Sequence, residues 1–281
     1  MSWSKVKTLL IVLFIFVNAF LLYNTFSTGG SSEISQQTVR ETAQILKSNN
    51  VDIDPSIIRQ KSETLKKAEI SNSIDARSNL AANLLGHCSE TEDGYVSEKG
   101  RLKFSSVAFY YENYDKSVKK EIDESNAIEV AANMLNEKKF KVNSSSVRDF
   151  TSVKKRYEVK FAKEINGFSV FESYIQINIS RDGILESIEG YWPEVILDES
   201  YSNAVECVGE TTVLINLLSA EGFDTSVQNE VVDIRTGYTL GGPPESDSPI
   251  LLTLLPAYRV ILKNGENYIF DAENGEFIYK Y

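Results

Sequence analysis

The fold is decided by a stretch in the middle of the chain, YEVKFAKEINGFSVFESYIQINISRDGILESIEGYW, residues 157–192. Apolar and polar residues alternate at 157–161 and again at 175–179, which is the period of a β-strand with one buried face. The dipeptides Asn-Gly at 166–167 and Asp-Gly at 182–183 are typical of tight hairpin turns. The stretch therefore predicts an antiparallel meander of three strands.

The spacing of apolar residues predicts a helix before this meander, and it predicts that this pattern of helix and meander occurs a second time in the sequence. Residues 126–138 carry an apolar stripe, and Asn126 is a candidate N-cap. A second helix is predicted at 210–220. We therefore predict two units, 123–200 and 201–281, each with a helix covering one face of an antiparallel sheet. The strands predicted in the second unit are 230–240, 251–262, 268–270 and 277–279.

Residues 33–122 are predicted to form a separate N-terminal α+β unit. Apolar spacing favours a helix at 38–48, and 51–53 alternates like a short strand. A second helix is predicted at 56–67, because a proline directly before it suits a first turn. Aromatic and β-branched residues predict strands between 95 and 114. The expected fold class is α+β, with a transmembrane helix followed by helix-covered antiparallel sheets.

Residues 1–32 are predicted to be a cytoplasmic tip, a transmembrane anchor and a linker. The run from Val6 to Phe26 is long enough to cross the hydrocarbon, which takes about 20 helical residues. Lys5 and Lys7 precede it, so the positive-inside rule predicts a single-pass cell-membrane protein with an extracellular C-terminal domain. The alternative is a signal peptide cleaved near 27–29.

Asn18 is the one interior polar residue of the predicted anchor. An amide in hydrocarbon gains about 0.6–2 kcal/mol from a hydrogen bond to another helix, so Asn18 is a candidate contact with a transmembrane partner. The alternative is that water near the outer end of the helix hydrates the amide.

Composition excludes several classes of function. The net charge of −11 would be repelled by nucleic acid and by anionic membrane surfaces, so any membrane attachment must be hydrophobic. The only histidine, His87, has Cys88 beside it, and Cys207 is far away in the sequence, too few ligands for a usual zinc site. A disulfide between the two cysteines stays open.

Other patterns give little support to catalysis. Residues 271–276 have only part of a calcium-loop pattern, and glycine-rich 237–242 lacks the Gly-Lys-Ser/Thr of a phosphate-binding loop. The many carboxylates lie at turns and on polar faces. We therefore predict no enzyme activity, no catalytic residue, no cofactor and no metal.

Three segments carry a resemblance to a known family. The start of the chain, from Trp3 through the apolar run to Tyr23, resembles the YycI-type regulatory proteins of Gram-positive bacteria. Residues 45–53 are similar to the helix and short strand that follow the anchor there. Residues 255–276 resemble the closing strands of the YycH/YycI group and of PepSY-type domains.

The resemblance implies an extracytoplasmic protein that binds an essential cell-wall sensor histidine kinase, called WalK or YycG, partly through transmembrane helices. Together with a YycH-type protein it would adjust two-component signalling, and the implied contact lies within Leu9 to Tyr23. The direction of regulation does not follow. A PepSY-like inhibitor or chaperone of an exported protease or cell-wall hydrolase is the alternative, and a wall-processing enzyme is a third hypothesis.

Overall fold

A computed structural model describes most of the chain beyond the predicted anchor. The predicted tip, anchor and linker lie outside the described residues, apart from Phe14 and Asn18. In the part that is described, no helix is long and apolar enough to cross a membrane. The described residues are 14, 18, 34–71, 73–105, 108–117, 121–196, 204–241 and 251–281.

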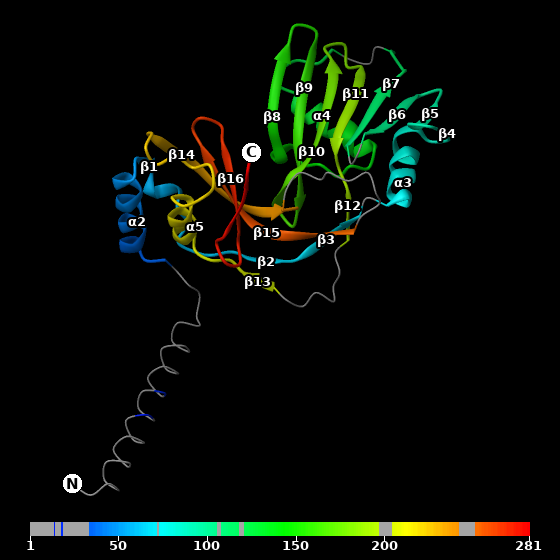
Figure 1. The fold of residues 1–281 in the computed structure, drawn as a ribbon. Helices are drawn as coiled ribbons and strands as arrows, with labels where there is room; N and C mark the ends of the chain where they lie inside the picture. Colours follow the sequence, from blue (N-terminus) through cyan, green and yellow to red (C-terminus); the bar gives the residue numbers. More distant parts are fainter. Residues whose placement is uncertain are drawn as a thin grey trace, which may run out of the picture.

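The described chain folds into two lobes that lie side by side (Figure 1). We call residues 34–71 together with 204–281 the terminal lobe, and residues 73–192 the middle lobe. The terminal lobe contains α2 (Gln36–Ser48), β1 (Val51–Ile53), η1 (Pro55–Ile57), β2 (Thr64–Lys66), β3 (Ala68–Ser71), β13 (Ala204–Glu206), α5 (Glu210–Leu217), β14 (Asn229–Thr239), β15 (Leu251–Leu262), β16 (Asn267–Asp271) and β17 (Phe277–Lys280). The middle lobe contains α3 (Ile74–Leu85), β4 (Ser89–Thr91), β5 (Gly94–Ser97), β6 (Gly100–Ser105), β7 (Ala108–Asn113), α4 (Ala127–Glu137), η2 (Ser144–Ser146), β8 (Val147–Val153), β9 (Arg156–Ile165), β10 (Phe168–Ser180) and β11 (Leu185–Tyr191).

Within the described residues, fifteen strands form one continuous sheet that runs through both lobes. Its main path is β12-β3-β15-β14-β10-β11-β7-β6-β5-β4, where β12 (Glu194–Ile196) follows the middle lobe and pairs with β3. The lobes are joined where β10 and β14 pair in parallel, Ser169 opposite Gly237 and Val170 opposite Tyr238. A second parallel pair, β1 with β14, lies in the terminal lobe. The prediction of purely antiparallel sheets was therefore wrong at these two pairs.

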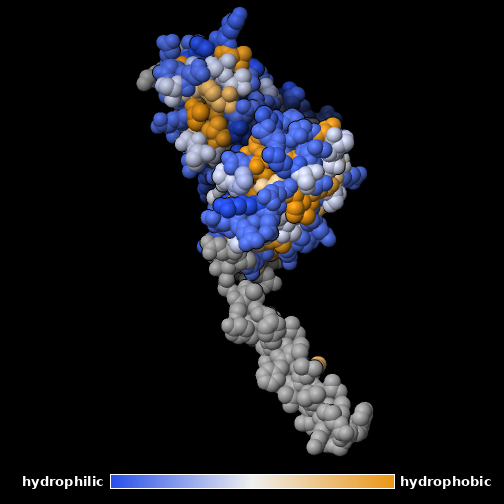
Figure 2. Space-filling model, turned by 90° about the vertical axis from the view of Figure 1, so that its left-hand side faces the viewer, coloured by the Kyte–Doolittle hydropathy of each residue, from blue (hydrophilic) through white to orange (hydrophobic). Residues whose placement is uncertain are grey.

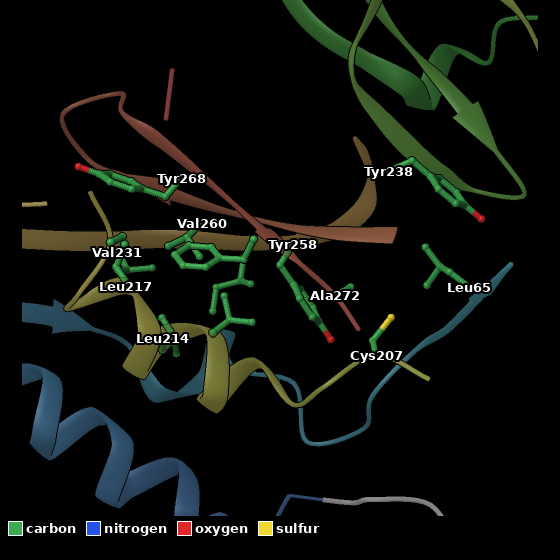
Figure 3. Close-up of a cluster of buried hydrophobic side chains, with 14 of the residues drawn as sticks. Leu65, Cys207, Leu214, Leu217, Val231, Tyr238, Tyr258, Val260, Tyr268 and Ala272 are labelled. Atoms are coloured by element: carbon green, nitrogen blue, oxygen red, sulfur yellow. The ribbon is translucent and has the colours of Figure 1, made fainter. Parts of the chain in front are cut away.

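The core of the terminal lobe lies between its helices and its strands. Val213, Leu214 and Leu217 of α5 are fully buried in this core. Leu214 and Leu217 face Tyr258 and Val260 of β15 (Figure 3). Helix α2 adds its own buried stripe to this core. The N-terminus of α2 is fixed by Ser35, whose hydroxyl oxygen accepts a hydrogen bond from the backbone N–H of Thr38.

The core of the middle lobe forms between α4 and one face of β9 and β10. Ala131 and Leu135 of α4 are fully buried with Val159 and Ile177 of these strands. The alternation predicted at 157–161 and 175–179 is confirmed, since every second residue of these two segments is buried in this core. Asn126 is the N-cap residue of α4, as predicted, but its side chain makes no hydrogen bond to the helix.

The prediction of a helix at 56–67 was also wrong. Only a single 3-10 turn forms at Pro55–Ile57, and β2 follows at Thr64–Lys66. The physical reason is tertiary: Leu65 is 1% exposed in the terminal core, and it reaches that core from a strand that pairs with β13. Helix α3 and strand β8 were not predicted, and the apolar spacing of α3 is weak in the sequence.

The predicted unit 33–122 divides between the two lobes. Helix α2 and strands β1–β3 join the terminal core, whereas α3 and strands β4–β7 join the middle core. In the units predicted at 123–200 and 201–281, helices α4 and α5 are each followed by strands, and these strands of both units belong to one sheet. Burial of apolar faces against distant strands therefore organises the first hundred residues.

We predict that replacing Leu214 by Ala lowers the free energy of unfolding of fragment 34–281 by about 2–5 kcal/mol, because it leaves a cavity under α5. The neighbouring change Ile215→Ala is the matched control. Ile215 is 37% exposed where Leu214 is fully buried, so its replacement costs less than about 1 kcal/mol. Urea unfolding measures both values, and equal losses would contradict this packing.

Candidate functional site

A cleft of about 700 Å³ lies on the middle lobe, and the chain at 193–195 and Ser71 of the terminal lobe close one side of it. Helix α3, the end of α4, the tip of the β9–β10 hairpin and the chain around β12 form its walls. We call it the interlobe cleft. Its lining residues are Ser71, Ala76, Arg77, Asn79, Leu80, Asn83, Phe104, Phe109, Lys138, Lys139, Phe140, Lys141, Lys163, Glu164, Ile165, Asn166, Trp192, Pro193, Glu194 and Val195.

An aromatic cluster forms one wall of the interlobe cleft. Phe140 stacks on Phe109, with ring centroids 6.0 Å apart and planes at 10°, and it meets Trp192 edge-on at 6.2 Å. Arg77 lies over the ring of Phe104, 5.1 Å from its centroid. Aromatic surface of this kind provides most of the binding energy at many recognition sites.

Basic side chains dominate the charge of the cleft. Five basic residues line it against two acidic ones, Glu164 and Glu194, although the whole chain carries a net charge of −11. The cleft therefore has the opposite sign to the protein that contains it. The five basic residues are Arg77, Lys138, Lys139, Lys141 and Lys163.

Three of these lysines come from the turn that follows α4. Lys139 and Lys141 have positive φ angles of 67° and 53°, while Phe140 between them is 5% exposed. The turn is closed by Asn136, whose side-chain amide donates to Val142 O at 3.0 Å and whose Oδ1 accepts from Val142 N at 2.8 Å. The backbone therefore holds the ring of Phe140 inward and leaves Lys139 and Lys141 exposed.

Lys138 has a mainly structural role. Its Nζ donates to Leu84 O at 3.2 Å, which ties the end of α4 to the end of α3, and it lies 5.7 Å from the ring centroid of Tyr111. A cation at the C-terminus of a helix is also favoured by the helix dipole. This lysine fixes the cleft wall more than it offers charge to a ligand.

Lys163 is the most perturbed group of the cleft. Its Nζ lies 4.5 Å from the ring centroid of Trp192. Burial is the main cause that lowers the pKa of Lys163 to about 8; Glu194 opposes this shift, and the charge of Lys141 contributes to it. Because its pKa is lowered, the Lys163 amine loses its proton more readily than that of an exposed lysine, as expected for its half-buried position beside the indole ring of Trp192.

The residues singled out in the sequence lie outside the cleft. The Nδ2 of Asn18 donates to Phe14 O at 2.8 Å, four residues earlier in the chain, so this N–H is satisfied without another helix. His87 is exposed. Cys88 and Cys207 are free thiols that pack against different cores, and burial raises the pKa of Cys207 to about 11.

Two further polar clusters stabilise the fold. Glu210 is 3% exposed and pairs with Arg59, whose Nε lies 3.0 Å from it; burial raises the pKa of this carboxyl. Glu172 of β10 accepts hydrogen bonds from the hydroxyls of Thr239 and Tyr279. Across the described ranges, no three or more His, Cys, Asp or Glu residues gather as a metal site would require.

The comparisons with known proteins show the fold alone. No family model matches the sequence, and no curated protein matches it. An uncharacterized protein from Eubacterium rectale ATCC 33656 has a similar fold, with a TM-score of 0.51 and 13% identity over 82% of this chain and 91% of the other. The C-terminal domain of YpeB from Bacillus megaterium aligns with a TM-score of 0.41 and 11% identity, over 75% and 97% of the two chains.

We predict that Lys163 makes the stability of fragment 34–281 depend on pH. Its pKa is about 8 in the folded chain and about 10.4 when unfolded. Between these values the unfolded chain binds more protons, so stability rises with pH. The free energy of unfolding, measured in urea from pH 7 to 9.5, is therefore expected to rise more steeply in the wild type than in Lys163→Met.

The control for this prediction is Lys154→Met, which removes an exposed lysine from the β8–β9 turn. Its difference from the wild type stays constant over the same pH range. A constant difference for Lys163→Met as well would mean that the Lys163 amine is fully hydrated.

Proposed function

We propose that this chain is a membrane-anchored extracytoplasmic regulator that binds a cell-wall sensor histidine kinase and modulates two-component signalling, together with a YycH-type protein. The observation that carries the proposal is the interlobe cleft, a concave surface with an aromatic wall and a basic rim. Such a surface suits recognition of another protein. The YycI-like order of features in the sequence supports the choice of a kinase as that protein.

The N-terminal sequence supports attachment to the membrane. A run of about 20 apolar residues after two lysines would hold the lobes beside the extracellular part of a membrane kinase. Tethering raises the effective concentration of one partner near the other, so a weak contact in the cleft is enough. Figure 2 shows that the outer surface seen from the side of the terminal lobe is mainly hydrophilic with separate apolar patches.

Co-purification tests the proposal. The full chain, affinity-tagged and extracted from its own membranes in mild detergent, is expected to recover a sensor histidine kinase. A contact between transmembrane helices contributes about 0.6–2 kcal/mol, so chain 33–281 is expected to recover roughly 3- to 30-fold less kinase. An unrelated single-pass protein with the same tag is the control. Equal recovery by the anchor-free chain would remove the transmembrane contact from the proposal.

A second outcome of the same experiment separates the alternative function. Recovery of an exported protease or cell-wall hydrolase, without a kinase, would contradict the proposal and favour a PepSY-like inhibitor or chaperone.

The substitution Asn18→Leu measures how much the side-chain amide of Asn18 contributes to kinase recovery. Because Asn18 is the interior polar residue of the anchor and its candidate contact with a partner helix, we expect this variant to recover roughly 3- to 30-fold less kinase than the wild type.

A further inference from the structure

We propose that the interlobe cleft binds an extended acidic peptide segment that carries an aromatic side chain. This inference deepens the proposed function, since the segment would belong to the protein partner. Three independent features support it: the charge of the cleft, the backbone geometry of its basic turn, and the strand at its edge.

The first feature is charge complementarity. Lys139 and Lys141 are exposed at the cleft rim, and Lys163 lies deeper. None of these three lysines takes part in the ion pairs found among the described residues. Their acidic neighbours in the cleft are Glu164 and Glu194. A concave surface with excess positive charge attracts an anionic partner.

The second feature is the backbone of the basic turn. Gly or Asn usually occupies left-handed positions after a helix, because other side chains are strained there by about 1–3 kcal/mol. This turn has lysines at two such positions, Lys139 and Lys141. Helix capping accounts for Lys138 but not for these two. The paired hydrogen bonds of Asn136 hold the turn in shape, so the backbone that carries both lysines is fixed before a ligand arrives.

The third feature is an edge strand in the cleft wall. β12 is the end strand of the sheet path among the described residues, and its Glu194 and Val195 line the cleft. The edge of a strand offers backbone groups to an extended peptide, which an inorganic polyanion cannot pair with in the same way. Trp192, which is partly exposed in the cleft and meets the buried Phe140 edge-on, would take an aromatic side chain from that peptide.

The test uses the full chain in non-ionic detergent and three polymers: a random glutamate–tyrosine copolymer, polyglutamate and polyphosphate. Isothermal titration calorimetry is expected to show tighter binding to the copolymer than to either of the others. Binding of polyphosphate as tight as that of the copolymer would overturn the inference, because charge alone would then explain it. So would the absence of copolymer binding.

Matched double variants locate the binding. Lys139→Gln with Lys141→Gln is expected to weaken copolymer binding roughly 2- to 30-fold, the effect of two exposed charges. Lys154→Gln with Lys155→Gln removes two exposed lysines from the β8–β9 turn and is expected to leave the affinity unchanged. Equal weakening in both variants would place the binding outside the cleft and overturn the inference.

Kinase recovery, measured on the same preparations, distinguishes this inference from the proposed function. Recovery of the kinase by a wild-type chain that binds no copolymer refutes the cleft inference alone. Copolymer binding that depends on Lys139 and Lys141, without recovery of any kinase, supports the inference and refutes the choice of the kinase as partner.

Discussion

The parallel pairing of β10 with β14 is the contact on which the rest of the structure depends. Only two residue pairs form it, and Gly237 is one of the four residues. A Cβ at Gly237 would lie 2.3 Å from Ser169 O, so the strands approach this closely only because that residue is glycine. Glu172, two residues after Val170, accepts hydrogen bonds from Thr239 and Tyr279 and reinforces the same junction. The relative position of the lobes, and with it the interlobe cleft, follows from this contact.

Strand β10 contributes residues to the cores of both lobes. Val170 near its start is buried in the terminal core, whereas Ile175 and Ile177 near its end are buried in the middle core. The hairpin tip before it carries Ile165 into the terminal core and places Lys163 in the cleft wall. The packing that joins the lobes therefore also positions the most perturbed charge of the candidate site.

The sequence predicted those elements whose burial pattern is local. The strands on either side of the turn at 166–167 were confirmed, because alternating apolar and polar residues indicate a strand with one buried face. The β10–β14 junction could not be predicted, since it joins strands about 70 residues apart through two residue pairs. The cleft was missed for the same reason: Lys138 to Lys141 stand out as a basic run around one phenylalanine, but Lys163 and Trp192 reach them only through the fold. Asn18, the one contact residue predicted from the sequence, stays a prediction, because its role depends on the helix of another protein.

Amide hydrogen exchange at the junction tests the central claim most directly. We expect the amides of 169–171 and 237–239 to exchange as slowly as those of the strands inside each lobe, because one continuous sheet holds the lobes together. Exchange at these positions as fast as in the exposed turn at 154–155, with both lobe cores still protected, would contradict the account. The lobes would then move independently, and no cleft of fixed shape would exist between them.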